Sequence, residues 1–236
     1  MRGLGTHYEL DVRCRGGVNA DTGYFLNIKD IDRAARASAI PLIERACHES
    51  PTIEPAEVLA RVLNPLDAAV GGSLESIRWR LSPYYSVAME TLAPGFALMR
   101  QQFEFAASHR LHVPSLTGEQ NRALFGKCNN PSGHGHNYRV EPCVRVPVRP
   151  GGHAGFVLAD LERLTNELVI SRFDHTNLNE DTAEFACAGG INPSVENIAK
   201  VLFGLLEPAI ASQGCGASLQ SITVWETDKT SCTYPG

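Results

Sequence analysis

Three histidines of the chain are spaced so that they could bind one metal ion. His134 and His136 are separated by a single glycine, and residues i and i+2 of a β-strand project to the same face. His109 lies in another segment, residues 103–113, whose odd positions form an apolar face at period two. If the two segments pair as a hairpin, three imidazoles converge, and this ligand set with an open fourth position is typical of catalytic zinc.

The alternative for each histidine is a core side chain whose hydrogen bonds are partly satisfied. That explanation suffices for any one of them alone, but convergence from two strands on one face favours a metal site. Gly133 and Gly135 leave room beside the backbone for a metal and its ligand. We therefore expect a zinc site formed by His109, His134 and His136.

Glu226 places a carboxylate in an apolar pattern near the end of the sequence. It lies on the same predicted strand face as Ile222 and Val224. Because an unpaired charge on an apolar face is costly, we expect Glu226 to contact a cationic partner or one rich in N–H groups.

Hydrophobic periodicity predicts the elements that must position these residues. In chain order they are a strand at 103–113, a short helix at about 118–124, a strand from His134, a helix at 158–168, a helix from Pro193–Ser194, and strands at 218–226 and 230–235. Pro142 and Pro147 indicate an edge or a bulge in the second strand. The order β-β-α-α-β-β predicts an α+β fold, with an antiparallel sheet covered by helices on one face.

The composition excludes several classes of protein. The 236 residues are 43% hydrophobic and 20% charged, an ordinary globular balance, and the formal net charge is −5 with no basic run. We therefore expect neither a nucleic-acid partner nor a membrane partner. The N-terminus has no signal-like apolar core, and the seven cysteines form no CxxC pair. Reduced thiols are typical of a cytoplasmic protein.

Four pairs of segments indicate an internal duplication. Residues 7–12, 22–32, 49–63 and 73–81 resemble residues 137–142, 154–164, 191–205 and 218–226, in the same order. A repeated order of weak matches favours two copies of one structural unit. We expect one domain at residues 1–98 and a second at residues 99–236.

The second domain resembles the 6-pyruvoyl-tetrahydropterin synthases. The resemblance is carried by FEFAASHRLH at 103–112, FGKCNNPSGHGHNY at 125–138, FDHTNLN at 173–179, NPSVEN at 192–197 and VWETD at 224–228. It extends to the related 6-carboxytetrahydropterin synthases of queuosine biosynthesis, although the spacing from Cys128 to His134 is closer to the pyruvoyl type. The resemblance implies a T-fold (tunnelling fold), here in tandem. It also implies a homo-oligomer that closes a β-barrel, with active sites between subunits.

The resemblance also implies roles for individual residues. His109, His134 and His136 match the zinc ligands, Cys128, Asp174 and His175 match the catalytic residues, and Glu226, Thr227, Ser194 and Glu196 match residues that bind or adjoin the pterin. A helix cap remains an equal alternative for Ser194, a structural thiol for Cys128, and a solvated helix end for the Asp-His pair. Since adjacent residues rarely face each other, we expect Asp174 or His175 to reach its partner across a subunit interface.

The function implied is the zinc-dependent conversion of 7,8-dihydroneopterin triphosphate to 6-pyruvoyl-tetrahydropterin with loss of triphosphate, a lyase reaction. Formation of 6-carboxytetrahydropterin from the same substrate is one alternative, and a non-enzymatic protein that binds a pterin or a metal is another. The first copy lacks HGH and FGKC, and Leu81 stands in place of Glu226. We therefore expect it to be non-catalytic and to supply strands and interfaces.

Overall fold

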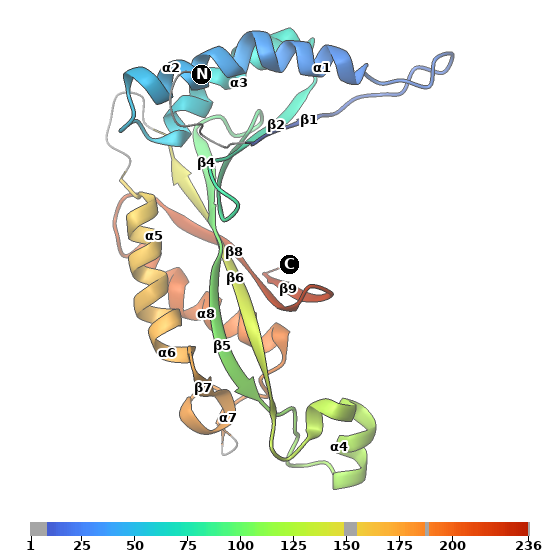
Figure 1. Cartoon of the computed structure of the whole chain (residues 1–236), viewed down its shortest axis with the longest axis vertical. Coiled ribbons are helices and arrows are strands. Elements are labelled where there is room, and N and C mark those ends of the chain that lie inside the picture. The colour runs from blue at the N-terminus through green and yellow to red at the C-terminus, as the bar shows by residue number, and fades with distance from the viewer. Residues whose placement is uncertain (1–8, 149–154, 187–188, 236) are drawn as a thin grey trace. The chain divides into compact units, whose positions relative to one another are not determined.

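The computed structural model describes residues 9–148, 155–186 and 189–235 (Figure 1). The chain divides into two compact units. The first comprises residues 1–100 with 145–157, and the second comprises residues 101–144 with 158–236.

The first unit combines four helical segments with a β-sheet. Its elements are β1 (Glu9–Cys14), α1 (Ile28–Ala34), the π-helix η1 (Ala35–Ala39), α2 (Ile40–Glu49), α3 (Pro55–Ala69), β2 (Leu74–Arg80), β3 (Tyr85–Glu90) and β4 (Phe96–Gln101). The strands follow the order β1-β2-β3-β4. Leu59 and Leu66 of α3 and Ile77 of β2 are fully buried where the helix packs on the sheet. The internal duplication stays a prediction.

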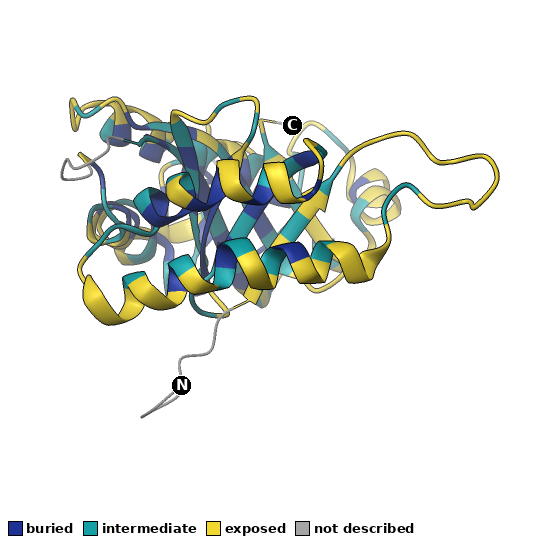
Figure 2. Cartoon of the chain, turned by 90° about the horizontal axis from the view of Figure 1, so that it is seen from above, coloured by how far each residue is buried: buried dark blue, intermediate teal, exposed yellow. Residues whose placement is uncertain are grey.

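The second unit follows the predicted order of elements. It contains β5 (Phe103–His109), α4 (Gly118–Phe125), the 3-10 helix η2 (Gly126–Asn129), β6 (His134–Pro147), α5 (Leu158–Thr165), the π-helix η3 (Asn166–Ile170), α6 (Ser171–Phe173), β7 (Thr176–Asn177), α7 (Leu178–Asp181), α8 (Val195–Ala211), β8 (Ser218–Thr227) and β9 (Thr230–Tyr234). The α+β class is therefore confirmed, and α8 packs on β8 and β9. Helices carry their buried residues as stripes and leave the remaining surface exposed (Figure 2).

β6 is an interior strand of the second unit. It pairs antiparallel with β5 along one side and also pairs with β8, which in turn pairs with β9. The alternative that Pro142 and Pro147 mark an edge is therefore wrong, while the alternative that they mark a bulge stays a prediction. The β5–β6 ladder ends at Val140, so the missing N–H of Pro142 falls outside it, and Pro147 is the last residue of the strand.

Two further expectations concern the whole sequence. Six of the seven cysteines are free, in agreement with reduced thiols, and Cys187 lies outside the described residues. Among the residues that the structure describes, no helix combines the length and the apolar character needed to cross a membrane.

Candidate functional site

The three histidines of the expected metal site lie together on one face of the sheet. The antiparallel register of β5 and β6 places His109 directly opposite His134, and His136 follows two residues later on the same face. The ring centroid of His109 lies 4.6 Å from that of His134 and 5.2 Å from that of His136. Strand alternation, which is a local property, is what brings His134 and His136 to one face.

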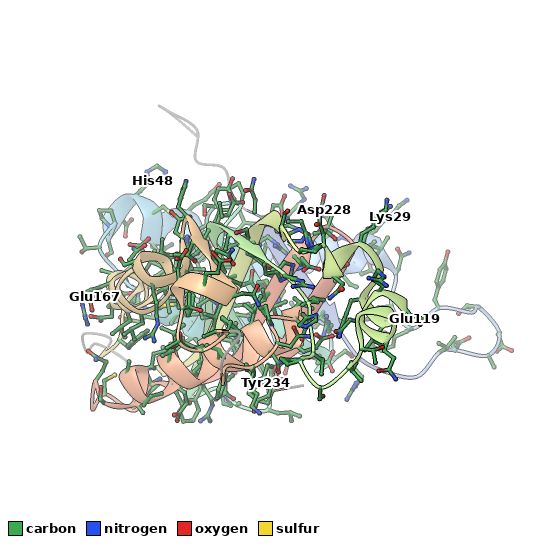
Figure 3. All side chains as sticks on the ribbon, turned by 90° about the horizontal axis from the view of Figure 1, so that it is seen from below. Lys29, His48, Glu119, Glu167, Asp228 and Tyr234 are labelled. Atoms are coloured by element: carbon green, nitrogen blue, oxygen red, sulfur yellow. The ribbon has the colours of Figure 1, made fainter. Side chains whose placement is uncertain are left out.

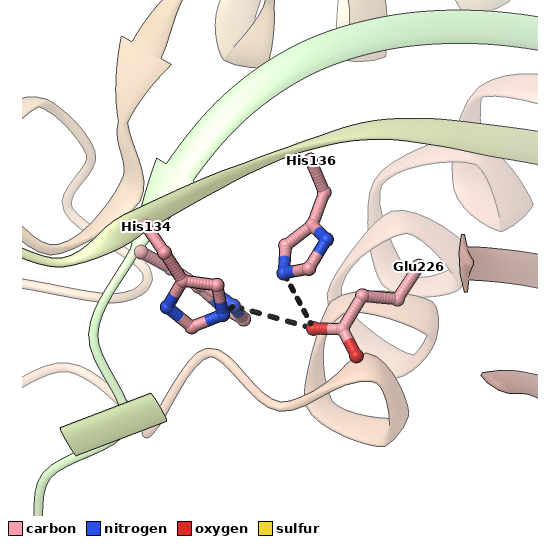
Figure 4. A group of neighbouring side chains, drawn as sticks. His134, His136 and Glu226 are labelled. Carbon is pink, nitrogen blue, oxygen red and sulfur yellow. Dashed lines mark hydrogen bonds and ion pairs between the residues drawn. The ribbon is translucent and has the colours of Figure 1, made fainter. Parts of the chain in front are cut away.

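Glu226 completes the group from β8. Its Oε1 lies 3.2 Å from Nε2 of His109 and 3.5 Å from Nε2 of His136 (Figure 4). The candidate ligand atoms of these three residues and His134 all lie within 4.8 Å of one another. The sequence predicted a cationic or N–H-rich partner for Glu226, and its partners are the imidazoles. That the carboxylate would join the histidines was not predicted.

Three of the spacings between these atoms are close to those around a bound metal ion. A tetrahedral ion with ligand bonds of about 2.0–2.2 Å separates its ligand atoms by roughly 3.3–3.6 Å. The Nε2 atoms of His109 and His134 are 3.2 Å apart, and the two contacts of Glu226 measure 3.2 and 3.5 Å. The group His109, His134, His136 and Glu226 could therefore hold a metal ion.

The outer contacts of His109 direct its lone pair into the cluster. Its Nδ1 lies 2.7 Å from the carbonyl oxygen of Pro193, and because a carbonyl only accepts, Nδ1 carries the proton. Nε2 is then the ring nitrogen that faces the ligand group. Sequence reasoning missed Pro193, because a backbone carbonyl can come from any residue type. The hydroxyl of Tyr138 also approaches Nδ1, at 3.3 Å.

Two ring nitrogens of the cluster are buried without a hydrogen-bond partner. They are Nδ1 of His134 and Nε2 of His136. Burial lowers the pKa of both imidazoles, and His109 lowers the pKa of His134 further. The neighbouring imidazoles, chiefly His109, hold the pKa of Glu226 below its ordinary value. Burial thus favours the neutral imidazoles of His134 and His136, and the low pKa of Glu226 favours its ionised carboxylate, the protonation states that metal ligands need.

Cys128 lies in η2, between α4 and β6, and is half-buried. It lines a cavity of about 600 Å³ that His134 also lines. The neighbouring Asn129 is buried, and its Nδ2 donates to the carbonyl oxygen of Leu111 at 2.7 Å. This contact ties the Cys128 turn to the chain that follows β5. The thiol and one candidate ligand therefore open onto the same space.

Asp174 and His175 contact each other within one chain. Nδ1 of His175 lies 2.9 Å from Oδ2 of Asp174, so the prediction that these adjacent residues would not face each other is wrong. The reason is the left-handed backbone of His175, with φ of 58°, which turns its ring back toward the carboxylate. Oδ1 of Asp174 accepts from the N–H of Ala106 at 2.8 Å. These contacts hold the pKa of Asp174 low, the backbone bond from Ala106 first.

The Asp-His pair does not join the histidine cluster of its own chain. Asp174 lies beside the β5 backbone at Ala106 rather than among the four clustered side chains. The side chain of His175 is 83% exposed. It lines a cavity of about 520 Å³ together with Asn177 of β7 and His136 of β6.

Ser194 and Thr227, two of the residues expected near a pterin, make local hydrogen bonds in this chain. Ser194 is the N-cap of α8 and accepts from the N–H of Asn197 at 3.4 Å, so the helix-cap alternative is realised. Glu196 is exposed in the first turn of the same helix. Thr227 is exposed, and its hydroxyl accepts from the N–H of Lys229 at 3.2 Å in the β8–β9 turn.

Comparison with known proteins identifies relatives of the second unit. The family model described as 6-pyruvoyl tetrahydropterin synthase matches residues 98–236. The protein of Homo sapiens named 6-pyruvoyl tetrahydrobiopterin synthase is 36% identical over 140 residues, covering 59% of this chain and 92% of that protein. The protein of the same name from Drosophila melanogaster is 34% identical over 142 residues, covering 59% of this chain and 80% of that protein.

A solved structure agrees with the sequence relatives. The structure of 6-pyruvoyl tetrahydropterin synthase from Caenorhabditis elegans is 34% identical, with a TM-score of 0.53, and the match covers 60% of this chain and 96% of that one. The family model alone spans more than half of the sequence. The chain therefore belongs to the 6-pyruvoyl tetrahydropterin synthase family.

Proposed function

We propose that the chain is a zinc-dependent lyase that converts 7,8-dihydroneopterin triphosphate to 6-pyruvoyl-tetrahydropterin with loss of triphosphate. The observation that carries the proposal is the group His109, His134, His136 and Glu226, with Cys128 on the wall of a cavity that reaches the group. The names of the relatives support the same activity. We also propose a location in the cytoplasm, for which seven cysteines without a CxxC pair are the support.

His109, His134 and His136 would hold the zinc ion, and its Lewis acidity would polarise the oxygens of the substrate side chain. The carbonyl of Pro193 fixes the ring of His109, so that this ligand loses little freedom on binding. Glu226 lies beside the three histidines with Oε1 at the imidazoles, and its carboxylate would also accept from the N–H groups of a pterin ring. Thr227, Ser194 and Glu196 complete the proposed surroundings of the pterin.

Cys128, Asp174 and His175 would move the protons. Cys128 as thiolate would accept a proton from a side-chain carbon of the substrate. Asp174 fixes the tautomer of His175, which suits the imidazole for passing a proton onward. Because His175 is exposed and lies outside the cluster of its own chain, we place it in the active site of a neighbouring subunit. This arrangement requires a homo-oligomer, here a T-fold barrel in which the first copy supplies strands without catalysing.

The direct test is incubation of the purified full chain with 7,8-dihydroneopterin triphosphate, followed by identification of the product. We expect the pyruvoyl product, its loss after treatment with a chelator, and its return on addition of zinc. Release of acetaldehyde with a carboxy product would instead assign the alternative synthase activity. Tight pterin binding without turnover would indicate a binding protein.

Histidine variants link this activity to the cluster. We expect His136→Ala to lose bound zinc and turnover together. His48→Ala is the matched control, because His48 lies exposed on the first unit (Figure 3). Zinc content measured by elemental analysis separates loss of metal from loss of chemistry, and full zinc content in His136→Ala would contradict the ligand assignment.

A further inference from the structure

Three cationic side chains gather at the cavity that contains Cys128. Arg110, Arg122 and Lys127 line the same space of about 600 Å³ as Cys128 and His134. Its remaining lining residues are glycines, asparagines and a proline, at Gly118, Gly126, Asn129, Asn130 and Pro131. The cavity wall therefore carries positive charge and no carboxylate, although the whole chain has a formal net charge of −5.

These cations are not neutralised by the protein. Within the described parts of the chain, the ion pairs found involve other arginines, and none includes Arg110, Arg122 or Lys127. By contrast, Arg163 on α5 lies 3.3 Å from Glu167. Like charges gathered without a counter-ion repel one another, and an anionic ligand removes that cost.

The backbone of Arg110 is held in place. Its N–H donates to Oδ1 of Asn179 at 2.6 Å, and its carbonyl accepts from Nδ2 of Asn179 at 3.1 Å. Its Nε donates to the carbonyl oxygen of Asn129 at 3.2 Å. One edge of the guanidinium is thus fixed by the protein, which leaves its terminal nitrogens for a ligand. A guanidinium suits phosphate because it can donate two parallel hydrogen bonds.

Arg122 and Lys127 come from the short elements beside Cys128. Arg122 lies on α4, whose start is fixed by a capping box between Thr117 and Gln120. Lys127 lies on η2, directly before Cys128. Both side chains are exposed, so a ligand would contact them without a large cost of removing water.

We infer that Arg110, Arg122 and Lys127 bind the triphosphate group of the substrate. The inference rests on the proposed function, which supplies a substrate with a triphosphate leaving group. A cavity of about 600 Å³ lies within the range of about 300–1,000 Å³ that is usual for small-molecule sites. Three cations match the several negative charges of a triphosphate better than they match an uncharged pterin ring.

This placement gives the cations a role in the elimination itself. The Cys128 thiolate takes the proton from the carbon next to the one that bears the phosphate ester. The electron pair of that C–H bond forms a C=C bond, while the C–O bond breaks and its pair leaves on the triphosphate oxygen. Arg110, Arg122 and Lys127 would stabilise the negative charge that develops on this oxygen.

The test uses inorganic triphosphate as the probe and the zinc-loaded full chain. By isothermal titration calorimetry we expect Arg122→Ala to weaken triphosphate binding about tenfold and Arg122→Ala/Lys127→Ala to weaken it about a hundredfold. Arg163→Ala, which removes an arginine elsewhere in the same unit, serves as the control and should bind like the unaltered chain. Unchanged circular dichroism and zinc content would show that the variants remain folded.

Turnover separates the two possible failures. If the double variant forms product with an unchanged KM, or binds triphosphate as tightly as the unaltered chain, the triphosphate assignment is overturned and the proposed function stands. A second outcome is that the unaltered chain binds triphosphate and the double variant does not, while neither chain forms product. In that case the triphosphate assignment stands and the proposed function fails. Binding of unphosphorylated 7,8-dihydroneopterin should be equal in all variants, since it lacks the group that these residues contact.

Discussion

In the cluster, Oε1 of Glu226 lies close to ring nitrogens of two histidines. Nε2 of His109 lies 3.2 Å from Oε1 of Glu226, and the imidazole lies next to an ionised carboxylate. Two acceptors at this distance repel unless a cation or a proton lies between them. A metal ion removes the repulsion and satisfies the unpartnered Nε2 of His136 at the same time. A bound cation would thus account both for the histidines and the glutamate at these positions and for the short contacts between them.

Metal binding should depend on pH through His134 and His136. Protons compete with a metal for the imidazole nitrogens, and burial lowers the pKa of both rings below the ordinary value of about 6.5. We expect zinc affinity to hold from pH 8 to about 6.5 and to fall only below it. Competition with a chromophoric chelator measures this, and release of zinc that begins above pH 7 would contradict the assignment.

The stability of the metal-free protein should change in the same window. The folded-state pKa of His134 and His136 is lower than the unfolded-state value, so the unfolded chain takes up protons first as the pH falls. Their contribution to the free energy of unfolding is therefore fully present above about pH 6.5 and is lost as the pH drops toward the lowered pKa values. Urea unfolding at a series of pH values would show the decline, and a rise would overturn the sign.

Replacing Cys128 should lower turnover without changing metal binding. We expect Cys128→Ser to lose turnover by at least about a hundredfold, because a serine hydroxyl is a far weaker acid and general base catalysis is commonly worth 10²–10⁴. Zinc content should stay unchanged, since the thiol is not one of the clustered ligand atoms. Cys47→Ser, an exposed cysteine of the first unit, is the control. Full turnover by Cys128→Ser would remove Cys128 from the mechanism.

At the scale of elements, buried asparagines hold the segment between β5 and β6. Nδ2 of Asn121 donates to the carbonyl oxygens of Val113, Leu116 and Thr117, and its Oδ1 accepts from the N–H of Val113 at 2.8 Å. Asn121 is fully buried. The loop that leads into α4 is therefore held by side-chain hydrogen bonds from Asn121, and no hydrophobic pattern reveals it.

Removing this side chain should cost stability. We expect Asn121→Ala to lower the free energy of unfolding by about 1–3 kcal/mol, because it leaves buried backbone groups without partners. Asn130→Ala is the matched control, since Asn130 is exposed and its Oδ1 accepts a single hydrogen bond, from Ser132. Urea denaturation compares the two variants, and equal losses would show that burial at Asn121 has no special role.

At the scale of the whole molecule, the position of His175 bears on assembly. Its imidazole is oriented by Asp174 but lies outside the cluster of its own chain. A side chain that is both oriented and 83% exposed is suited to acting on a neighbouring subunit. The proposal that active sites form between subunits therefore has a direct consequence for mixtures of variants.

Cys128→Ala and His175→Ala should complement each other. Each variant alone should be inactive, but subunits exchanged between them would form some sites with an intact cysteine from one chain and an intact histidine from another. Random mixing restores about a quarter of the sites. Measured turnover after joint unfolding and refolding tests this. Activity that stays at the level of the separate variants would place the whole site within one chain.

The sequence by itself determined the elements of the second unit and the chemistry of its strands. Side chains alternate at period two in a strand, so HGH places His134 and His136 on one face whatever the rest of the chain does. The helical spacing of leucines predicted α5, and Pro193 followed by the N-cap residue Ser194 predicted the start of α8. These features depend on neighbours a few residues away, which is why they are visible in the sequence.

Only the tertiary structure decided which distant groups meet. Glu226 joins the histidines because β8 pairs with β6, and Pro193 contributes a backbone carbonyl, which any residue type could have provided. The contact of Asp174 with His175 depends on one positive φ value, and Pro142 lies beyond the end of the β5–β6 ladder at Val140. Strand partners, single dihedral angles and backbone acceptors are set by packing across the whole chain, and no local pattern of residue types encodes them.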